Sequence, residues 1–98
     1  MTYIVLFEDN PTADPEIRQT HMKAHLSFLG DHAGQVLAAG PLHDDLGASA
    51  GGLWIVQGKN AAAVERLVLQ DPFWPTGLRA SYRILQWTQV FGNLGSEI

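Results

Sequence analysis

The spacing of apolar residues along the chain predicts six secondary-structure elements. Four segments rich in β-branched and aromatic residues are typical of strands; they are residues 2–7, 35–42, 52–57 and 79–89. Two segments have apolar residues at helical spacing; they are residues 14–32 and 60–71. The resulting order, β-α-β-β-α-β, predicts an α+β fold of the ferredoxin-like type, with two helices on one face of a four-stranded antiparallel sheet.

Residues that favour helix ends mark both predicted helices. Asp14 is expected to be the N-cap of the first helix, with Pro15 in its first turn, and this helix is expected to end near His32. Asn60 is expected to cap the second helix, which ends at Asp71 because a proline follows. Each helix has an apolar stripe that can pack on the sheet; the stripes are Ile17, Ala24, Phe28 and Leu29, and Ala62, Val64, Leu67 and Val68.

Three of the four predicted strands are apolar on both faces. In the first strand, one face carries Tyr3, Val5 and Phe7, and the other carries Ile4 and Leu6. Two helices cover only one face of a sheet, so the second face needs another cover. A symmetric partner chain is the simplest cover, and we expect a homodimer in which two sheets pack face to face as a dimeric α+β barrel. A different partner chain would serve the same purpose.

The composition is that of one folded domain. The chain has 98 residues, of which 46% are hydrophobic and 16% are charged, and this excludes a disordered chain. We expect a single domain over residues 1–91 and a loose C-terminal tail over residues 92–98. The net charge of −4, without a basic cluster, argues against a nucleic-acid partner, and no apolar segment is long enough to span a membrane. Because the chain has no cysteine and its N-terminus does not resemble a signal peptide, we expect a cytoplasmic protein.

Three short segments place residues of particular chemistry in apolar surroundings; they are MKAHLSFL (22–29), LAAGPL (37–42) and DPFWPTGL (71–78). His25 lies on one predicted helix and Asp71 ends the other, so they form a candidate proton-transfer pair if the fold brings them together. Asp71 would then orient the imidazole and hold its tautomer, leaving the second ring nitrogen as base or acid. The alternative is that Asp71 only ends its helix and that His25 is a partly buried structural residue.

The order and wording of these three segments resemble the YCII-related (YciI-like) family across nearly the whole chain. The resemblance implies a small dimeric α+β protein in which His25, from an "HL" motif, faces Asp71, from a "DPF" motif. It also allows an elimination or an isomerisation, since some relatives are dehydrochlorinases of hydroxylated chloroaromatics and related folds isomerise lactones. The family often has an arginine three residues before the histidine, where this chain has Met22, and this departure leaves the charge of the substrate open.

Five further residues are expected to bind a substrate; they are Arg18, Gly40, Pro41, Phe73 and Trp74. Arg18 lies two helical turns before His25, where its charge suits an anionic substrate, although a solvated surface arginine is the alternative. The Gly40-Pro41 step would let the backbone approach a ligand, or would simply end a strand. Phe73 and Trp74 would wall the pocket and partly exclude water.

No metal and no cofactor are expected. His21 and His25 are four residues apart, as in the paired histidines of helical zinc sites, but the glutamate of the HExxH motif is missing between them. Residues 43–51 are expected to form a loop, and the Gly-rich stretch over residues 47–52 lacks the GK[ST] ending of a phosphate loop. We expect this stretch to be mobile, with a lid over the pocket as one option.

The leading functional hypothesis is a small cofactor-free enzyme that uses His25 and Asp71 for acid–base chemistry on a small organic molecule, such as an aromatic or an enol. The reaction would be an elimination, such as dehydrochlorination, or an isomerisation, so the enzyme would be a lyase or an isomerase. The competing hypothesis is a non-catalytic module that binds a small ligand or serves in dimerisation. A heme-free monooxygenase of the related dimeric-barrel type is favoured less, because the motifs are the His–Asp ones.

Overall fold

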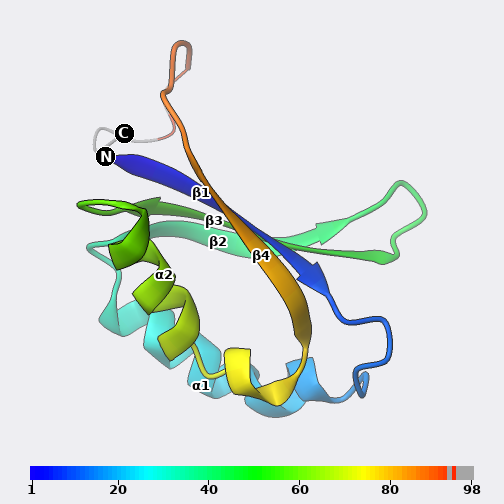
Figure 1. Ribbon diagram of the computed structural model, residues 1–98. Helices are drawn as coiled ribbons and strands as arrows, with labels where there is room; N and C mark the ends of the chain where they lie inside the picture. The colour runs from blue at the N-terminus through cyan, green and yellow to red at the C-terminus, as the bar shows by residue number, and fades with distance from the viewer. Residues whose placement is uncertain (93, 95–98) are drawn as a thin grey trace.

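A computed structural model describes residues 1–92 and residue 94 of the chain (Figure 1). Its elements, in the predicted order, are β1 (Thr2–Asp9), α1 (Ile17–Asp31), β2 (Val36–His43), β3 (Ser49–Gln57), α2 (Ala61–Gln70), the 3-10 turn η1 (Trp74–Thr76) and β4 (Arg79–Gln86). Neither α1 nor α2 combines the length and the hydropathy that a helix needs to cross a membrane. The expected loose tail, residues 92–98, lies outside the described residues except at positions 92 and 94, so it stays a prediction.

The four strands form one antiparallel sheet in the order β2-β3-β1-β4. Both helices lie on the same face of this sheet (Figure 1). The arrangement confirms the predicted ferredoxin-like α+β fold. Because β2 is an edge strand, it tolerates Pro41, which has no N–H to donate to a second neighbour.

The core lies between the helices and the inward face of the sheet. On this face Val5 of β1 lies opposite Trp54 of β3 and Ile84 of β4. α2 packs against the sheet through three buried residues of its predicted stripe, Val64, Leu67 and Val68. Ala62, the fourth residue of that prediction, is exposed instead. Burial of these side chains stabilises the fold by roughly 25 cal/mol for each Å² of apolar surface removed from water.

The start of α1 differs from the prediction. Oδ1 of Asp14 accepts the N–H of Glu16 at 2.9 Å and closes a local turn, so Asp14 is not the N-cap and the helix begins three residues later, at Ile17. Ala24, predicted on the buried stripe, is exposed, because the helix turns a neighbouring stripe toward the sheet. The C-terminal end of α1, with His32 as its C-cap, lies where the sequence predicts it.

Residues 43–51 form the end of a β-hairpin rather than an open loop. β3 begins at Ser49, which pairs with His43 of β2, so only residues 44–48 remain outside the strands. Oδ1 of Asp44 accepts the N–H groups of Leu46 and Ala48, both at 2.9 Å, and this closes the turn. The hairpin projects from the body of the protein (Figure 1). At the other end of the chain, β4 ends at Gln86, three residues earlier than predicted.

Candidate active site

His25 faces the sheet from the middle of α1. It is the one buried residue among the fifteen of this helix, with 8% of its surface exposed. Its imidazole stacks on the ring of Phe73, with the ring centroids 4.2 Å apart. A polar group therefore occupies the position where an apolar residue would normally pack, and it needs a hydrogen-bond partner to offset its loss of water.

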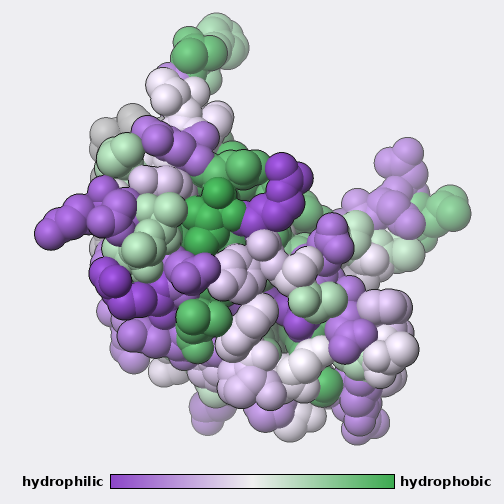
Figure 2. All heavy atoms as spheres, viewed as in Figure 1, coloured by the Kyte–Doolittle hydropathy of each residue, from purple (hydrophilic) through white to green (hydrophobic). Residues whose placement is uncertain are grey.

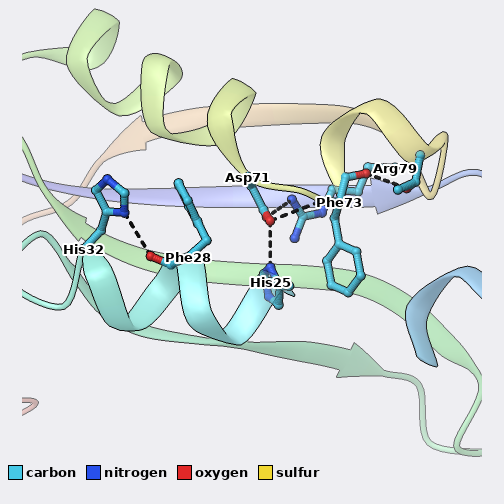
Figure 3. Close-up of polar contacts among 7 residues, drawn as sticks. His25, Phe28, His32, Asp71, Phe73 and Arg79 are labelled. Carbon is cyan, nitrogen blue, oxygen red and sulfur yellow. Dashed lines mark hydrogen bonds and ion pairs between the residues drawn. The ribbon is translucent and has the colours of Figure 1, made fainter. Parts of the chain in front are cut away.

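Asp71 supplies that partner from the end of α2. It is the C-cap of this helix, with φ −62° and ψ 130°, which is the extended conformation that a following proline favours. The side chain leaves α2 and points toward α1 (Figure 3). Its Oδ1 lies 2.8 Å from Nδ1 of His25 and also accepts the backbone N–H of Phe73 at 3.1 Å. The expected contact between His25 and Asp71 is present, and its catalytic role stays a prediction.

Arg79 contacts the other oxygen of the same carboxylate. Its Nη1 donates to Oδ2 of Asp71 at 2.6 Å (Figure 3). The guanidinium also stacks on Phe7, with Cζ 3.9 Å from the ring centroid, and 7% of the Arg79 side chain is exposed. All of the polar side-chain atoms buried in the described part of the chain have a hydrogen-bond partner, so this charged cluster carries no unsatisfied group there.

Burial and neighbouring charges act in opposite directions on Asp71. Burial alone would raise its pKa, because it disfavours the ionised form. The hydrogen bond from His25, the charge of Arg79 and the Phe73 N–H together outweigh burial and hold the pKa of Asp71 below its ordinary value. Burial likewise lowers the pKa of Arg79, although Asp71 opposes this shift. The result is a carboxylate that is ionised at neutral pH and paired with a guanidinium.

An ionised Asp71 fixes the proton on one nitrogen of His25. A carboxylate can only accept, so Nδ1 of His25 must be the donor in the 2.8 Å contact. In the neutral imidazole this leaves Nε2 without a proton, as a base, and in the imidazolium Nε2 carries a proton, as an acid. The negative charge of Asp71 also stabilises the imidazolium once a proton has been taken up. The pair therefore has the parts needed for proton transfer at Nε2.

A cavity of about 110 Å³ lies beside His25, between α1 and the strands β1 to β3. Four of the five residues expected to bind a substrate line it, namely Arg18, Gly40, Pro41 and Phe73. Apolar side chains form much of the remaining wall: Phe7, Met22, Leu26, Leu29 and Trp54. Because an apolar cavity of roughly 150 Å³ accommodates benzene, this smaller volume admits at most a single ring.

Trp74, the fifth expected residue, does not line this cavity. It begins the 3-10 turn after Phe73, and its ring packs edge-on against Tyr82 of β4, with centroids 5.1 Å apart. The Phe73 side chain forms part of the cavity wall and the Trp74 side chain points away from the cavity, because consecutive residues of a tight turn face different directions.

Two residues of the site were missed by sequence reasoning, Arg79 and Asp9. Asp9 lines the cavity and accepts hydrogen bonds at Oδ2 from Nη2 of Arg18 at 2.9 Å and from the Ser49 hydroxyl at 2.8 Å. A signal for Asp9 was present, because it follows Tyr3, Val5 and Phe7 at the two-residue spacing of the inward face.

A metal site is not apparent among residues 1–92 and 94, where no three His, Asp or Glu side chains are grouped closely enough to hold an ion. His21 is partly buried one turn before His25 and is not among the residues that line the cavity.

The comparisons with known proteins agree with this fold. The family model of the YCII-related domain matches residues 1–88, whereas no curated protein matches the chain. Among solved structures, the chain is similar to 5-chloro-2-hydroxyhydroquinone dehydrochlorinase (TftG) from Burkholderia phenoliruptrix AC1100, in complex with 2,5-dihydroxybenzoquinone. The TM-score is 0.74, with 23% sequence identity over 90% of this chain and 94% of that chain, and this likeness shows a shared fold. Since the family model covers nearly all of the sequence, the protein belongs to the YCII-related domain family.

Proposed function

We propose that this protein is a small cofactor-free enzyme that transfers a proton between His25 and a small cyclic organic substrate, in an elimination or an isomerisation. The observation that carries the proposal is the 2.8 Å contact between Nδ1 of His25 and the buried carboxylate of Asp71, beside a cavity of single-ring size. This arrangement gives His25 a fixed tautomer and a free Nε2 at the cavity wall.

In an elimination, Nε2 of His25 first moves a proton from an O–H group of the substrate to the ring carbon that bears chlorine, and this gives a keto tautomer in which that carbon is tetrahedral. Nε2 then takes a second O–H proton, the electron pair of that bond moves into the ring, and the C–Cl bond breaks, so that chloride departs with its electrons and a quinone is left. The imidazolium, stabilised by Asp71, then returns the proton to water. In an isomerisation the same imidazolium returns the proton to a different atom of the substrate, and nothing leaves.

The similar dehydrochlorinase supports this reaction type. Its substrate is a chlorinated, hydroxylated ring, and its structure contains a dihydroxybenzoquinone. A planar ring of this kind could stack on Phe73 and Trp54, which line the cavity beside His25.

The test is turnover with 5-chloro-2-hydroxyhydroquinone as the first probe, followed by chloride release and by quinone absorbance. We expect His25→Gln to lower kcat by about 10²- to 10⁴-fold, the usual contribution of general acid–base catalysis. The matched control is His21→Gln, which removes a histidine one helical turn away and should leave kcat within about twofold. Turnover that survives His25→Gln contradicts the proposal. Binding without turnover across a panel of chlorinated and hydroxylated rings favours the non-catalytic binding module instead.

We also propose that the protein acts as a homodimer. The outward face of the sheet carries five apolar residues that neither helix covers, Ile4, Leu6, Leu53, Ile55 and Leu85. Figure 2 shows apolar side chains gathered in part over β4 and at the tips of the segments that project from the body. A second sheet packed on this face would remove the five residues from water and complete the dimeric α+β barrel expected from the sequence.

A further inference from the structure

Two Arg–Asp ion pairs flank the cavity, and they differ in exposure. The inner pair, Arg79–Asp71, has side chains that are 7% and 0% exposed. The outer pair, Arg18–Asp9, has side chains that are 31% and 22% exposed, and both of its members line the cavity. The Arg79–Asp71 pair is therefore buried in the interior, whereas the Arg18–Asp9 pair is accessible to a ligand in the cavity.

The two pairs also differ in how easily they can exchange partners. Separating a buried pair leaves an uncompensated charge and shifts an equilibrium by more than about a hundredfold. An exposed pair is worth at most about a fivefold change in an equilibrium constant. Arg18, and not Arg79, is therefore the guanidinium that can leave its carboxylate for a ligand.

Asp9 remains satisfied when Arg18 leaves it. The hydroxyl of Ser49, at the start of β3, donates to the same Oδ2 of Asp9 at 2.8 Å. Because this second donor stays in place and the carboxylate is partly open to water, the exchange does not leave a buried oxygen without a partner.

Arg18 is also placed so that one ligand can reach both it and His25. Cζ of Arg18 lies 6.0 Å from the centroid of the Phe73 ring, and the imidazole of His25 stacks on the same ring at 4.2 Å. A planar ring in the cavity can therefore direct an anionic substituent to Arg18 and its reacting edge to His25.

We propose that the cavity selects planar, single-ring anions, carboxylates or phenolates, through Arg18, and that Asp9 limits this selectivity because it competes with the anion of the ligand for Arg18. The proposal names the ligand class of the site proposed above and so rests on that site, although it makes a claim about binding and not about turnover. Asp9 is then a specificity-determining residue that acts through Arg18. A guanidinium binds a ligand carboxylate in bidentate geometry, which lets the ligand displace the single contact from Asp9.

The test is calorimetric titration with benzoate and with benzamide, its neutral analogue of nearly the same shape. We expect the wild-type protein to prefer benzoate, and Asp9→Asn to raise benzoate affinity about two- to fivefold while benzamide affinity stays constant. Arg18→Gln should abolish the preference, and in the Arg18→Gln background Asp9→Asn should give no gain. The matched control is Glu8→Gln, which removes one negative charge from the neighbouring, exposed position of β1 and should not change the benzoate-to-benzamide ratio.

A measurement on the wild-type protein covers the case in which a variant does not fold. The Nε–H resonance of Arg18 should shift during titration with benzoate and stay in place with benzamide. The proposal is overturned if neither the wild type nor Asp9→Asn binds benzoate at millimolar concentration, if Glu8→Gln gives the same gain as Asp9→Asn, or if the gain persists without Arg18. Selective benzoate binding without any turnover would leave this inference intact and count against the proposed catalysis. Turnover without anion selectivity would support the proposed catalysis and overturn this inference.

Discussion

Arg79 donates to Oδ2 of Asp71 at 2.6 Å, so the carboxylate that orients His25 through Oδ1 is also the counter-ion of a buried guanidinium. Oδ1 of Asp71 thus accepts a hydrogen bond from the imidazole of His25, and Oδ2 accepts one from the guanidinium of Arg79. The division keeps the carboxylate ionised in an interior where burial alone would favour its protonated form. Orientation of His25 and stability of the fold consequently depend on the same side chain.

The first prediction concerns Asp71→Asn. The substitution leaves the Arg79 guanidinium buried without a counter-charge, so we expect the free energy of unfolding to fall by about 3–5 kcal/mol. Urea unfolding at pH 7 measures this loss. Asp45→Asn is the matched control, because Asp45 is exposed in the hairpin turn and should change stability by less than about 0.5 kcal/mol. A loss below about 1 kcal/mol for Asp71→Asn would show that Arg79 finds water or another partner.

The second prediction concerns pH. The pKa of Asp71 in the folded protein is lowered, whereas in the unfolded chain it takes its ordinary value of about 3.9. Above that value the carboxylate is ionised in both states, and its stabilising contribution is complete. As pH falls below about 3.9 and through the lower folded pKa, the unfolded chain takes up the proton first and the contribution is lost. The difference in unfolding free energy between the wild type and Asp71→Asn should therefore shrink as the pH falls from 5 toward 3.

Urea titrations of both proteins at each pH give this difference directly, and the subtraction removes the other carboxylates that titrate in the same range. A difference that stays constant from pH 5 to pH 3 would mean that the pKa of Asp71 is not set by its contacts with His25 and Arg79.

The parts of the fold that could be predicted from the sequence are those fixed by local chemistry. Asn60 caps α2 by accepting the N–H of Ala63 at 2.9 Å, as its position before an apolar helical face indicates. Pro72 forces Asp71 into the extended conformation, which determines where the carboxylate points. The start of α1 was not predictable in this way, since Asp14 can close either a turn or a helix and the two differ little in free energy.

Arg79 was missed because its direction depends on pairing between strands. In β4, Tyr82 and Ile84 lie opposite the inward residues Phe7 and Val5, and simple alternation would turn Arg79 outward. The register shifts between Glu8 and Asp9, so that Arg79 pairs with Asp9 and turns inward onto Phe7. The alternation of apolar and polar residues along one strand does not indicate a bulge of this kind.

The third prediction concerns Gly51, which is buried and has φ of +100°. A Cβ at this position would clash with the carbonyl oxygen of Phe7, so the backbone must move to admit it. We expect Gly51→Ala to lower the free energy of unfolding by more than about 2 kcal/mol, through strain at this φ and through the clash. Gly34→Ala is the control, because nothing lies within 4 Å of its added Cβ and its φ is not positive. Equal stability of the two variants in urea would contradict the prediction.

The fourth prediction concerns the outward face of the sheet. Ile55 lies in its middle, beside Ile4 of β1, and Ile4 in turn lies beside Leu85 of β4. If a second copy covers this face, Ile55→Lys places a charge in an apolar interface that should exceed about 1,000 Å² in total, and the dimer should dissociate. The monomer itself should stay folded, since Ile55 takes no part in the core between the sheet and the helices.

Sedimentation velocity at micromolar concentration distinguishes the two states, and circular dichroism checks the fold. Leu69→Lys is the matched control: it makes the same kind of change at an exposed position of α2, in the helix layer, and should leave the dimer intact. A wild-type protein that sediments as a folded monomer would contradict the proposed homodimer. Dissociation by Leu69→Lys and not by Ile55→Lys would place the interface on the helices instead, because a charge disrupts only the surface that a partner buries.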